Sequence, residues 1–236
     1  MIFIYSRRPS FSAKELQFSL KEQNLQAKRL RALTPINETD FLINWGAKNN
    51  LGLNANIVGD KLKEISLLKE GGVKVPKFSI EKVEGWLARK RRHSGGNDLI
   101  QNLEVGDFYV EKIEDILHEF RLHIFKNKSI RAGIKRAKEN AHPWIRNHQH
   151  GWYMDYGAFC QERLEKKIRY MAKKAVRVLN YDFGAVDIAL RENGKTIVFE
   201  VNSAPGLETL NTSRAYARAI FKLYTENNTE GQNADD

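Results

Sequence analysis

Residues Phe183 to Glu208 read FGAVDIALRENGKTIVFEVNSAPGLE, and this stretch decides how the rest of the chain is interpreted. Two apolar-patterned runs flank Asn193-Gly194, a pair that favours a two-residue type I′ turn because both turn positions need positive φ. Counting outward from such a turn places Asp187 directly opposite Glu200. Asn202 then projects from the same face, two residues farther along. The stretch therefore predicts a β-hairpin that gathers two carboxylates and an amide.

Two like charges that face each other across a ladder are destabilising unless a cation lies between them. An oxygen-only trio of Asp187, Glu200 and Asn202 suits Mg²⁺ or Mn²⁺ better than zinc. The alternative is that the carboxylates are separately solvated, with Arg191 as a partner. The Ser203–Gly206 loop, which ends the strand beside them, favours a site. The opposite face is wholly apolar and is expected to belong to a core: Val186, Ile188, Leu190, Ile197, Phe199 and Val201.

The composition is that of a soluble globular protein. Of the 236 residues, 42% are hydrophobic and 29% are charged, which is enough to bury a full core. The single Cys160 excludes an internal disulfide and fits a reducing compartment. No apolar run approaches the roughly 20 residues needed to span a bilayer. Ile2–Tyr5 is too short for a signal-peptide core, so we expect a first strand there and a cytoplasmic protein.

The net charge of +10 is unevenly distributed. Residues 225–236 carry four acids and no base, and they are predicted to form a disordered acidic tail. Basic residues concentrate in Arg89–His93 and in Lys126–His150. Such fields attract polyanions, which include nucleic acid, a nucleoside triphosphate or an acidic protein segment. Charge by itself does not choose among these partners.

The first sixty residues alternate between strand and helix patterns. Ile2–Tyr5 and Phe41–Trp45 are predicted strands, and Ser12–Glu22 is a predicted helix with Ser12 as its N-cap. This alternation favours a mainly parallel sheet. Asp60–Glu70 forms a second predicted helix that Gly71 and Gly72 end.

A strand with one polar face is predicted around residues 119–124. Glu119, Arg121 and His123 alternate with apolar residues there, and a return strand is expected after the Lys126-Asn127-Lys128 turn. Residues 135–151 are expected to form an irregular basic loop, a length that usually signals function or disorder. Two more helices are predicted, at residues 156–179 and 213–224.

Some of the remaining signals are weak on their own. His93-Ser94-Gly95-Gly96 could wrap phosphates, because backbone N–H groups approach oxygen where no side chain intervenes, but a plain surface turn is the alternative. His142, His148 and His150 invite a zinc interpretation, which we disfavour because their spacing fits no common ligand pattern. The glycine-bearing segment at residues 93–96 occurs in one chain with the predicted metal-binding hairpin and the basic segments. This combination favours phosphoryl transfer, which proteins catalyse mainly by positioning and charge neutralisation.

Residues 60–210 resemble the ATP-grasp superfamily, and within it the carboxylate–amine ligases that add glutamate to a ribosomal protein tail. The most specific part is Asp187 followed by Glu200-Val201-Asn202-Ser203-Ala204-Pro205-Gly206-Leu207-Glu208, which is similar to the family's metal aspartate and its E-V-N-x-x-P-G-L-E segment. The resemblance implies that Asp187 and Asn202 each hold one Mg²⁺ and that Glu200 bridges both ions.

Upstream matches are looser. Asp60-Lys61-Leu62 is similar to the family's entry segment, which implies that Lys61 contacts phosphate. Residues 109–113 look like the hinge that meets adenine, and Glu119 would bind the ribose hydroxyls. The hinge contacts implied are Glu111, Lys112 and Ile113. Two basic segments would face the γ-phosphate and the acyl acceptor, and their implied contacts are Lys135, Arg136, Arg146 and Asn147.

One segment departs from the family. The usual K-P-x-x-G-x-x-G loop is here Arg89-Lys90-Arg91-Arg92-His93-Ser94-Gly95-Gly96, and Asp98 stands where the family has its last glycine. Arg89 occupies the phosphate-lysine position with Lys90 beside it, while Gly95 and Gly96 would cover the phosphates. Arginine keeps the charge of lysine but differs in shape and reach.

The resemblance implies an α/β chain with an ATP-grasp fold: two α+β lobes that clamp ATP, preceded by a small Rossmann-like unit. The predicted units are residues 1–59 (α/β unit), 60–115 (N-terminal lobe), 116–224 (C-terminal lobe with the metal site) and 225–236 (tail). The implied activity is an ATP- and Mg²⁺-dependent ligase that joins a carboxylate to an amine through an acylphosphate. Its catalytic candidates are Arg146, Arg121 and Arg136.

Two other classes remain open at this point. The basic charge allows a nucleic-acid-binding or nucleic-acid-modifying protein on the same scaffold, whose binding would fall steeply with salt. The altered Arg89 segment allows a non-catalytic ATP-binding module. The carboxylate and amine substrates, whether small molecules or a protein tail, leave no motif in the sequence.

Overall fold

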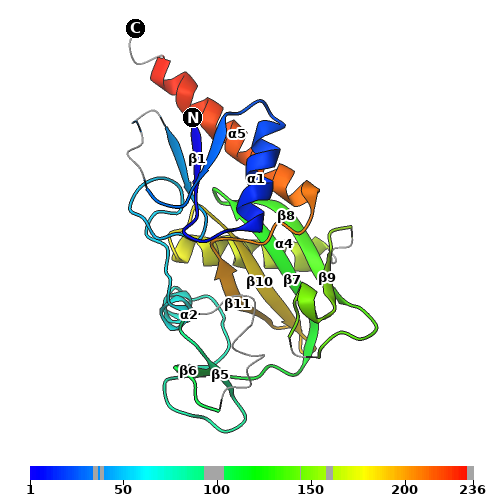
Figure 1. Cartoon of the computed structure of the whole chain (residues 1–236). Coiled ribbons are helices and arrows are strands. Elements are labelled where there is room, and N and C mark those ends of the chain that lie inside the picture. The colour runs from blue at the N-terminus through cyan, green and yellow to red at the C-terminus, as the bar shows by residue number, and fades with distance from the viewer. Residues whose placement is uncertain (34–36, 38–39, 93–103, 144, 158–161, 233–236) are drawn as a thin grey trace.

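The computed structural model describes residues 1–33, 37, 40–92, 104–143, 145–157 and 162–232. Figure 1 shows a mixed α/β molecule in which a small N-terminal sheet, a five-stranded sheet and a second small sheet follow one another from top to bottom. The strands are β1 Ile2–Tyr5, β2 Ala27–Leu30, β3 Phe41–Asn44, β4 Phe78–Ser79, β5 Leu87–Arg89, β6 Phe108–Val110, β7 Ile116–Phe125, β8 Lys128–Ala137, β9 Trp152–Asp155, β10 Phe183–Arg191 and β11 Thr196–Asn202. The helices are α1 Phe11–Lys21, α2 Lys61–Glu70, the 3-10 turn His148–His150, α4 Glu162–Val178 and α5 Leu210–Gln232.

The N-terminal unit is a parallel sheet in the order β2-β1-β3, in agreement with the alternating sequence pattern. Strand β2 was not predicted, because its sequence AKRL has no alternation that marks a strand. Helix α1 is capped by Ser10, whose Oγ accepts a hydrogen bond from the backbone N–H of Ala13 at 3.2 Å. The predicted cap, Ser12, instead accepts a hydrogen bond from the Trp45 indole at 2.9 Å.

The five-stranded antiparallel sheet, in the order β11-β10-β7-β8-β9, carries the larger core. One of its faces packs against α4, which buries Ile168, Ala172, Ala175 and Val176 at helical spacing. At one end of the opposite face, Phe125 and Phe183 pack with the N-terminal unit and α5. Farther along β7 and β10, the same face carries polar residues instead.

The β10–β11 hairpin pairs Asp187 with Glu200 as predicted, but by a different route. The turn has three residues between its flanking pair, because Arg191 N–H donates to Lys195 O at 2.8 Å and Gly194 N–H donates to Arg191 O at 2.9 Å. Of the predicted turn pair, Gly194 alone has positive φ, at 74°. The longer turn shifts the pairing by one residue, and a β-bulge after Asp187 shifts it back.

The shifted pairing between the turn and the bulge corrects the predicted apolar face. Ile188 pairs with Val198, so Val198 and not Ile197 joins the core under α4. Phe199 is the extra residue of the bulge and lines a cavity. A two-residue turn with positive φ at both positions does occur in the chain, at Lys126 and Asn127 between β7 and β8, where the sequence predicted a turn.

The small sheet, in the order β4-β6-β5, packs against α2 through Leu62, Ile65, Phe108 and Val110. Asp60 caps α2 by accepting hydrogen bonds from the N–H groups of Leu62 and Lys63 at 2.9 and 3.1 Å. The other side of α2 reaches the large core through Leu68. Helix α2 therefore joins the small sheet to the five-stranded sheet.

Helix α5 includes most of the segment that was predicted to be a disordered acidic tail, residues 225–236, of which residues 233–236 lie outside the described part of the chain. It begins at Leu210 and continues to Gln232, so the chain is helical well beyond residue 224, where disorder was predicted. The first turns of α5 are fixed by burial of Tyr216, Ala217 and Ile220, and a helix that is already formed extends at low cost per residue. No helix among the described residues is long and apolar enough to cross a membrane.

Candidate functional site

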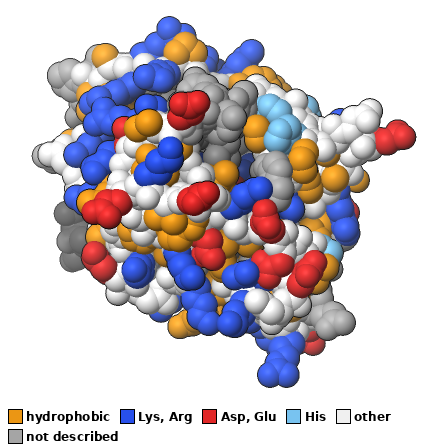
Figure 2. Space-filling model, turned by 90° about the horizontal axis from the view of Figure 1, so that it is seen from below, with side chains coloured by type: hydrophobic (Ala, Val, Ile, Leu, Met, Phe, Trp, Pro, Cys, Tyr) orange, Lys and Arg blue, Asp and Glu red, His pale blue; other side chains and the backbone are white. Residues whose placement is uncertain are grey.

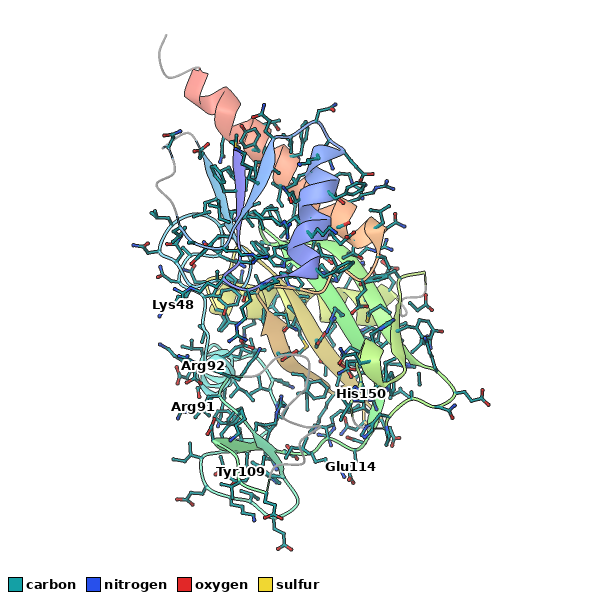
Figure 3. The ribbon with its side chains drawn as sticks, viewed as in Figure 1. Lys48, Arg91, Arg92, Tyr109, Glu114 and His150 are labelled. Carbon is teal, nitrogen blue, oxygen red and sulfur yellow. The ribbon has the colours of Figure 1, made fainter. Side chains whose placement is uncertain are left out.

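A cavity of about 650 Å³ lies between α2, the small sheet and the polar part of the five-stranded sheet. This volume is within the usual range for small-molecule sites. Figure 2 looks onto this end of the molecule, where basic and acidic side chains are interspersed with hydrophobic ones. In Figure 3, His150 lies on one side of the lower part of the molecule, and Arg91 and Arg92 lie on the other side beside α2.

Asp187 stands at the centre of the polar sheet face and is 4% exposed. Arg121 on the neighbouring strand holds it with two hydrogen bonds, from Nε to Oδ1 at 2.7 Å and from Nη2 to Oδ2 at 2.8 Å. A third nitrogen of the same guanidinium donates to Glu208 at 3.0 Å. Burial raises the pKa of Asp187, but the charges of Arg121 and Lys135 outweigh burial and hold the pKa below its usual value.

Glu119 and Lys135 form a second buried pair next to Asp187. The Lys135 ammonium donates to Glu119 Oε1 and lies 3.6 Å from Asp187 Oδ2. Arg146 approaches Glu119 from the segment that follows β8, with Nε at 4.0 Å from Oε2. Burial raises the pKa of Glu119, and the charge of Lys135 only partly opposes that rise. Glu119 is thus paired with basic residues in the wall of the cavity, and its predicted contact with ribose stays a prediction.

Glu200 lies across the hairpin from Asp187 and is joined to α2. Lys61 Nζ lies 3.3 Å from Glu200 Oε2, and 3.2 and 3.3 Å from the two carboxylate oxygens of Glu64. The Asn202 amide donates to Glu200 Oε1 at 2.9 Å. Burial lowers the pKa of Lys61, but the charges of Glu64 and Glu200 reverse this and raise it above its usual value. The cavity therefore has carboxylates balanced by side-chain cations at this end.

The other end of the cavity, beside the small sheet, has largely apolar walls and also carries Arg89, Glu111 and Lys112. Its walls come from α2, the small sheet, the segment after β6 and the bulge of β11: Ile65, Pro76, Leu87, Phe108, Val110, Ile113, Ile116 and Phe199. The backbone of residues 111–113 crosses this end. The Glu111 carboxylate accepts a hydrogen bond from Lys77 N–H at 3.3 Å, and Lys112 pairs with Glu114 at 3.0 Å. An apolar end and a charged end suit a ligand with a flat ring and an anionic tail.

The segment after β8 closes one side of the cavity with Arg146, Asn147, His142 and His150. The Arg146 guanidinium lies 4.7 Å from the centre of the Trp152 ring, a cation–π contact. The Asn147 side chain accepts a hydrogen bond from His150 N–H at 3.1 Å, so it caps the short 3-10 turn. The segment is thus partly regular, whereas an irregular loop was predicted through residues 135–151.

Most of the predicted site residues line this one cavity. They are Lys61, Arg89, Glu111, Lys112, Ile113, Glu119, Arg121, Lys135, Arg146, Asn147, Asp187 and Glu200. Asn202 is held against Glu200 but does not line the cavity. Lys90 does not line it either, and Gly95 and Gly96 lie outside the described residues.

Arg136 is not part of the cavity. Successive residues of a strand point to opposite faces, so Lys135 enters the site and Arg136 points away from it. Arg136 lies 3.6 Å from Asp155 of β9, and its side chain is 42% exposed. Arg136 is therefore placed outside the cavity in which the other two catalytic candidates, Arg121 and Arg146, lie.

Sequence reasoning missed several cavity residues, of which Glu64 is the most consequential. Glu64 is 3% exposed and accepts a hydrogen bond from the backbone N–H of Val201 at 3.0 Å. A spacing of three residues from Lys61 on a helix was the available signal, since such pairs lie on one helix face. The same spacing is common on solvated faces, which is why it did not stand out.

The hairpin residues fit a hard divalent cation by their chemistry. Asp187 and Glu200 supply carboxylate oxygens. The Asn202 amide nitrogen donates its hydrogen bond to Glu200, so the carbonyl oxygen of the Asn202 amide is the atom that could bind the metal. Mg²⁺ is usually held by one or two carboxylates together with substrate phosphates. Within the described part of the chain, no cluster of three or more His, Cys, Asp or Glu side chains is arranged as a metal site.

No protein-family model and no curated protein sequence matches the chain. Solved structures do match. D-alanine–D-alanine ligase from Bacillus anthracis complexed with ATP aligns with a TM-score of 0.65 and 14% identity over 96% of this chain and 99% of the ligase. The ATP-grasp ligase PsnB complexed with a minimal precursor aligns with a TM-score of 0.66 and 9% identity over 94% and 98%.

A third similar structure is N5-carboxyaminoimidazole synthase from Aspergillus clavatus, in complex with ADP and 5-aminoimidazole ribonucleotide. Its TM-score is 0.64 at 13% identity, over 94% of this chain and 76% of that one. At such identities the likeness shows the fold, and it extends over nearly the whole chain. The protein therefore has the ATP-grasp fold, and its structure is similar to those of these solved ligases.

Proposed function

We propose that this protein is an ATP- and Mg²⁺-dependent ligase that joins a carboxylate to an amine and releases ADP and phosphate. The observation that carries the proposal is the division of one cavity in an ATP-grasp fold. Its apolar end suits a purine, and its charged end brings Asp187 and Glu200 together with Lys61, Arg121 and Lys135. Binding of a nucleoside triphosphate across both ends would use every wall of the cavity.

The nucleotide would lie with its base among the apolar residues and against the backbone of residues 111–113. Lys61, Arg89 and Lys135 would neutralise its phosphates, because all three are basic residues that line the same cavity. Gly95 and Gly96 are proposed to cover the phosphates by analogy with the family loop. Asp187, Glu200 and Asn202 would hold Mg²⁺, which would supply charge neutralisation at the β- and γ-phosphates.

The proposed reaction has two steps. A carboxylate oxygen of the first substrate attacks the γ-phosphorus, the bond to the bridging oxygen breaks, and ADP leaves. The amine of the second substrate then attacks the acylphosphate carbon, loses a proton and expels phosphate. Arg146 and Arg121 would stabilise the negative charge that develops, since both guanidinium groups line the charged end. The segment with Arg146 and Asn147 would exclude water, because hydrolysis of the acylphosphate is the competing reaction.

Paired thermal-shift measurements test the nucleotide and metal assignments. Wild-type protein should gain thermal stability with ATP and Mg²⁺ together, because a ligand that binds the folded state raises its melting temperature. The double variant Asp187→Asn, Glu200→Gln should lose the Mg²⁺-dependent part of that gain. An undiminished gain, or undiminished ATP turnover, in the double variant would sink the metal assignment.

A second candidate function is binding of single-stranded nucleic acid, and one observation favours it. A second cavity of about 660 Å³, on the other side of residues 76–77, is lined by Trp86, Phe78 and five basic residues: Lys69, Lys74, Lys77, Arg191 and Lys195. Aromatic rings among cations stack on bases. Anisotropy of a labelled oligonucleotide should then fall steeply with salt and weaken in Trp86→Ala. Salt-independent or absent binding removes this candidate.

A further inference from the structure

Glu64 is a buried acid beside the charged end of the cavity, although the proposed reaction has no use for it. It lies on α2, and its side chain is 4% exposed. A buried carboxylate is costly unless it is paired and hydrogen-bonded. Glu64 has both kinds of partner, and each partner belongs to the candidate site.

The first partner is the strand that carries Glu200 and Asn202. Glu64 Oε1 accepts the backbone N–H of Val201, the residue between those two, at 3.0 Å. Strand β11 is the edge of its sheet, and its outward N–H groups need acceptors. Val198 finds one in the Lys74 carbonyl at 2.8 Å, and Val201 finds one in Glu64. Glu64 therefore fixes the edge strand between the two proposed metal ligands.

The second partner is the ammonium group of Lys61. Lys61 lies 3.2 and 3.3 Å from the Glu64 oxygens and 3.3 Å from Glu200, so two carboxylates share one cation. A neutral amide at position 64 could still accept from Val201. It could not share the charge of Lys61, which would then pair with Glu200 alone. The negative charge of Glu64 thus has a role that its hydrogen bond does not require.

We propose that Glu64 is a positioning residue that holds Lys61 away from full pairing with Glu200, and so leaves Glu200 for Mg²⁺ and Lys61 for the ATP phosphates. The inference rests on the proposed function. Its mechanism is competition: Lys61 and Mg²⁺ are cations that seek the same Glu200 carboxylate. Without the charge of Glu64, Lys61 competes more strongly, and more Mg²⁺ is needed to bind ATP.

The test measures how much Mg²⁺ the Glu64→Gln variant needs in order to bind ATP. Mg²⁺ is titrated at a fixed ATP concentration, and the thermal shift reports binding. A charged hydrogen bond of ordinary strength predicts that the Mg²⁺ concentration at half-effect rises about tenfold. Glu70→Gln is the matched control, because Glu70 lies on the same helix but is exposed, and it should keep the wild-type midpoint. Adding Lys61→Met to Glu64→Gln should return the midpoint to the wild-type value or below, even though ATP binds more weakly.

Each outcome decides between two roles. A wild-type Mg²⁺ midpoint in Glu64→Gln, with a lower melting temperature, would mean that Glu64 only stabilises the fold, and it would overturn the inference. Should Glu64→Gln not fold, Lys61→Met is compared with the double variant. Their midpoints should be equal if Glu64 acts through Lys61, and a higher midpoint in the double variant contradicts this. Absence of Mg²⁺-dependent ATP binding in wild-type protein would instead refute the proposed function.

Discussion

Two basic side chains from neighbouring strands, Arg121 and Lys135, neutralise the negative charge of the Asp187 carboxylate, as a bound metal ion would. Arg121 donates two hydrogen bonds to the Asp187 carboxylate, and the Lys135 ammonium lies 3.6 Å from Asp187 Oδ2. For Mg²⁺ to bind Asp187 as proposed, it would have to displace part of this basic charge from the carboxylate. Arg121 already has a second partner in Glu208, which can hold it once it leaves Asp187.

Arg121→Gln tests this exchange. Removing one partner of a buried ion pair leaves an uncompensated charge, so the free energy of unfolding should fall by about 3 kcal/mol. Mg²⁺ should then stabilise the variant more than it stabilises wild-type protein, because it replaces the lost cation at Asp187. Urea unfolding with and without Mg²⁺ measures both effects. An equal Mg²⁺ effect in the two proteins would place the ion elsewhere.

The buried His123 should make the free energy of unfolding depend on pH. It is fully buried between the hydroxyl groups of Tyr216 and Tyr156, and burial, aided by the charge of Arg121, lowers its pKa to about 3. Because the pKa is lower in the folded state, the unfolded chain binds a proton first as pH falls. The stabilising contribution is complete above the unfolded value near 6.5 and is lost on descent toward the folded value.

His123→Gln should remove that dependence. The wild-type free energy of unfolding, measured relative to this variant, should fall by about 1.4 kcal/mol for each pH unit between the two pKa values. Urea unfolding at several pH values checks the slope. Parallel curves for the two proteins would show that His123 does not remain neutral in the folded state.

At the scale of elements, the hairpin shows both what sequence reasoning reaches and where it stops. Alternation and an Asn-Gly turn were enough to place Asp187 opposite Glu200. The three-residue turn and the bulge at Phe199 each move the register by one residue, in opposite directions, so their errors cancel at the site. An Asn-Gly pair fits both a two-residue turn and a three-residue loop with glycine in the left-handed position, and a bulge is set by what packs against the strand on both sides.

The N-terminal unit makes a close contact with the loop that follows β11, and that contact yields a further prediction. Gly46 follows β3 with φ of 67°, and a Cβ there would lie 2.7 Å from the Cβ of Ala204, in the loop after Asn202. Gly46→Ala should therefore cost about 1–2 kcal/mol for the left-handed backbone plus a further 1–3 kcal/mol for the clash.

Two matched variants separate these contributions in denaturant unfolding. Gly85→Ala has a similar φ of 77° with nothing within 4 Å, so it should show the backbone cost alone. Adding Ala204→Gly to Gly46→Ala should recover the clash but not the backbone cost. Equal losses in Gly46→Ala and Gly85→Ala would mean that the N-terminal unit does not press on the site loop.

At the scale of the whole molecule, the five-stranded sheet, α2 and the small sheet enclose the cavity, and α5 fastens the N-terminal unit to the large sheet. The site face of the sheet could be predicted from alternation at Glu119, Arg121 and His123. The contribution of Glu64 could not, because its partners at positions 200 and 201 lie far along the chain and depend on how α2 docks. Long-range pairing of charges leaves no periodic signal in the sequence.

The most direct test of the account is a product screen by mass spectrometry. Purified protein is incubated with Mg²⁺, ATP labelled in its γ-phosphate, and pairs of carboxylates and amines that include amino acids and acidic peptides. A carboxylate–amine ligase should form, from at least one pair, a product whose mass equals both substrates minus one water, with the label in free phosphate and with equal release of ADP. The Asp187→Asn, Glu200→Gln variant should form none. Mg²⁺-dependent ATP binding without such a product from any pair, or label retained in a stable phosphorylated product, would contradict the assignment as a carboxylate–amine ligase.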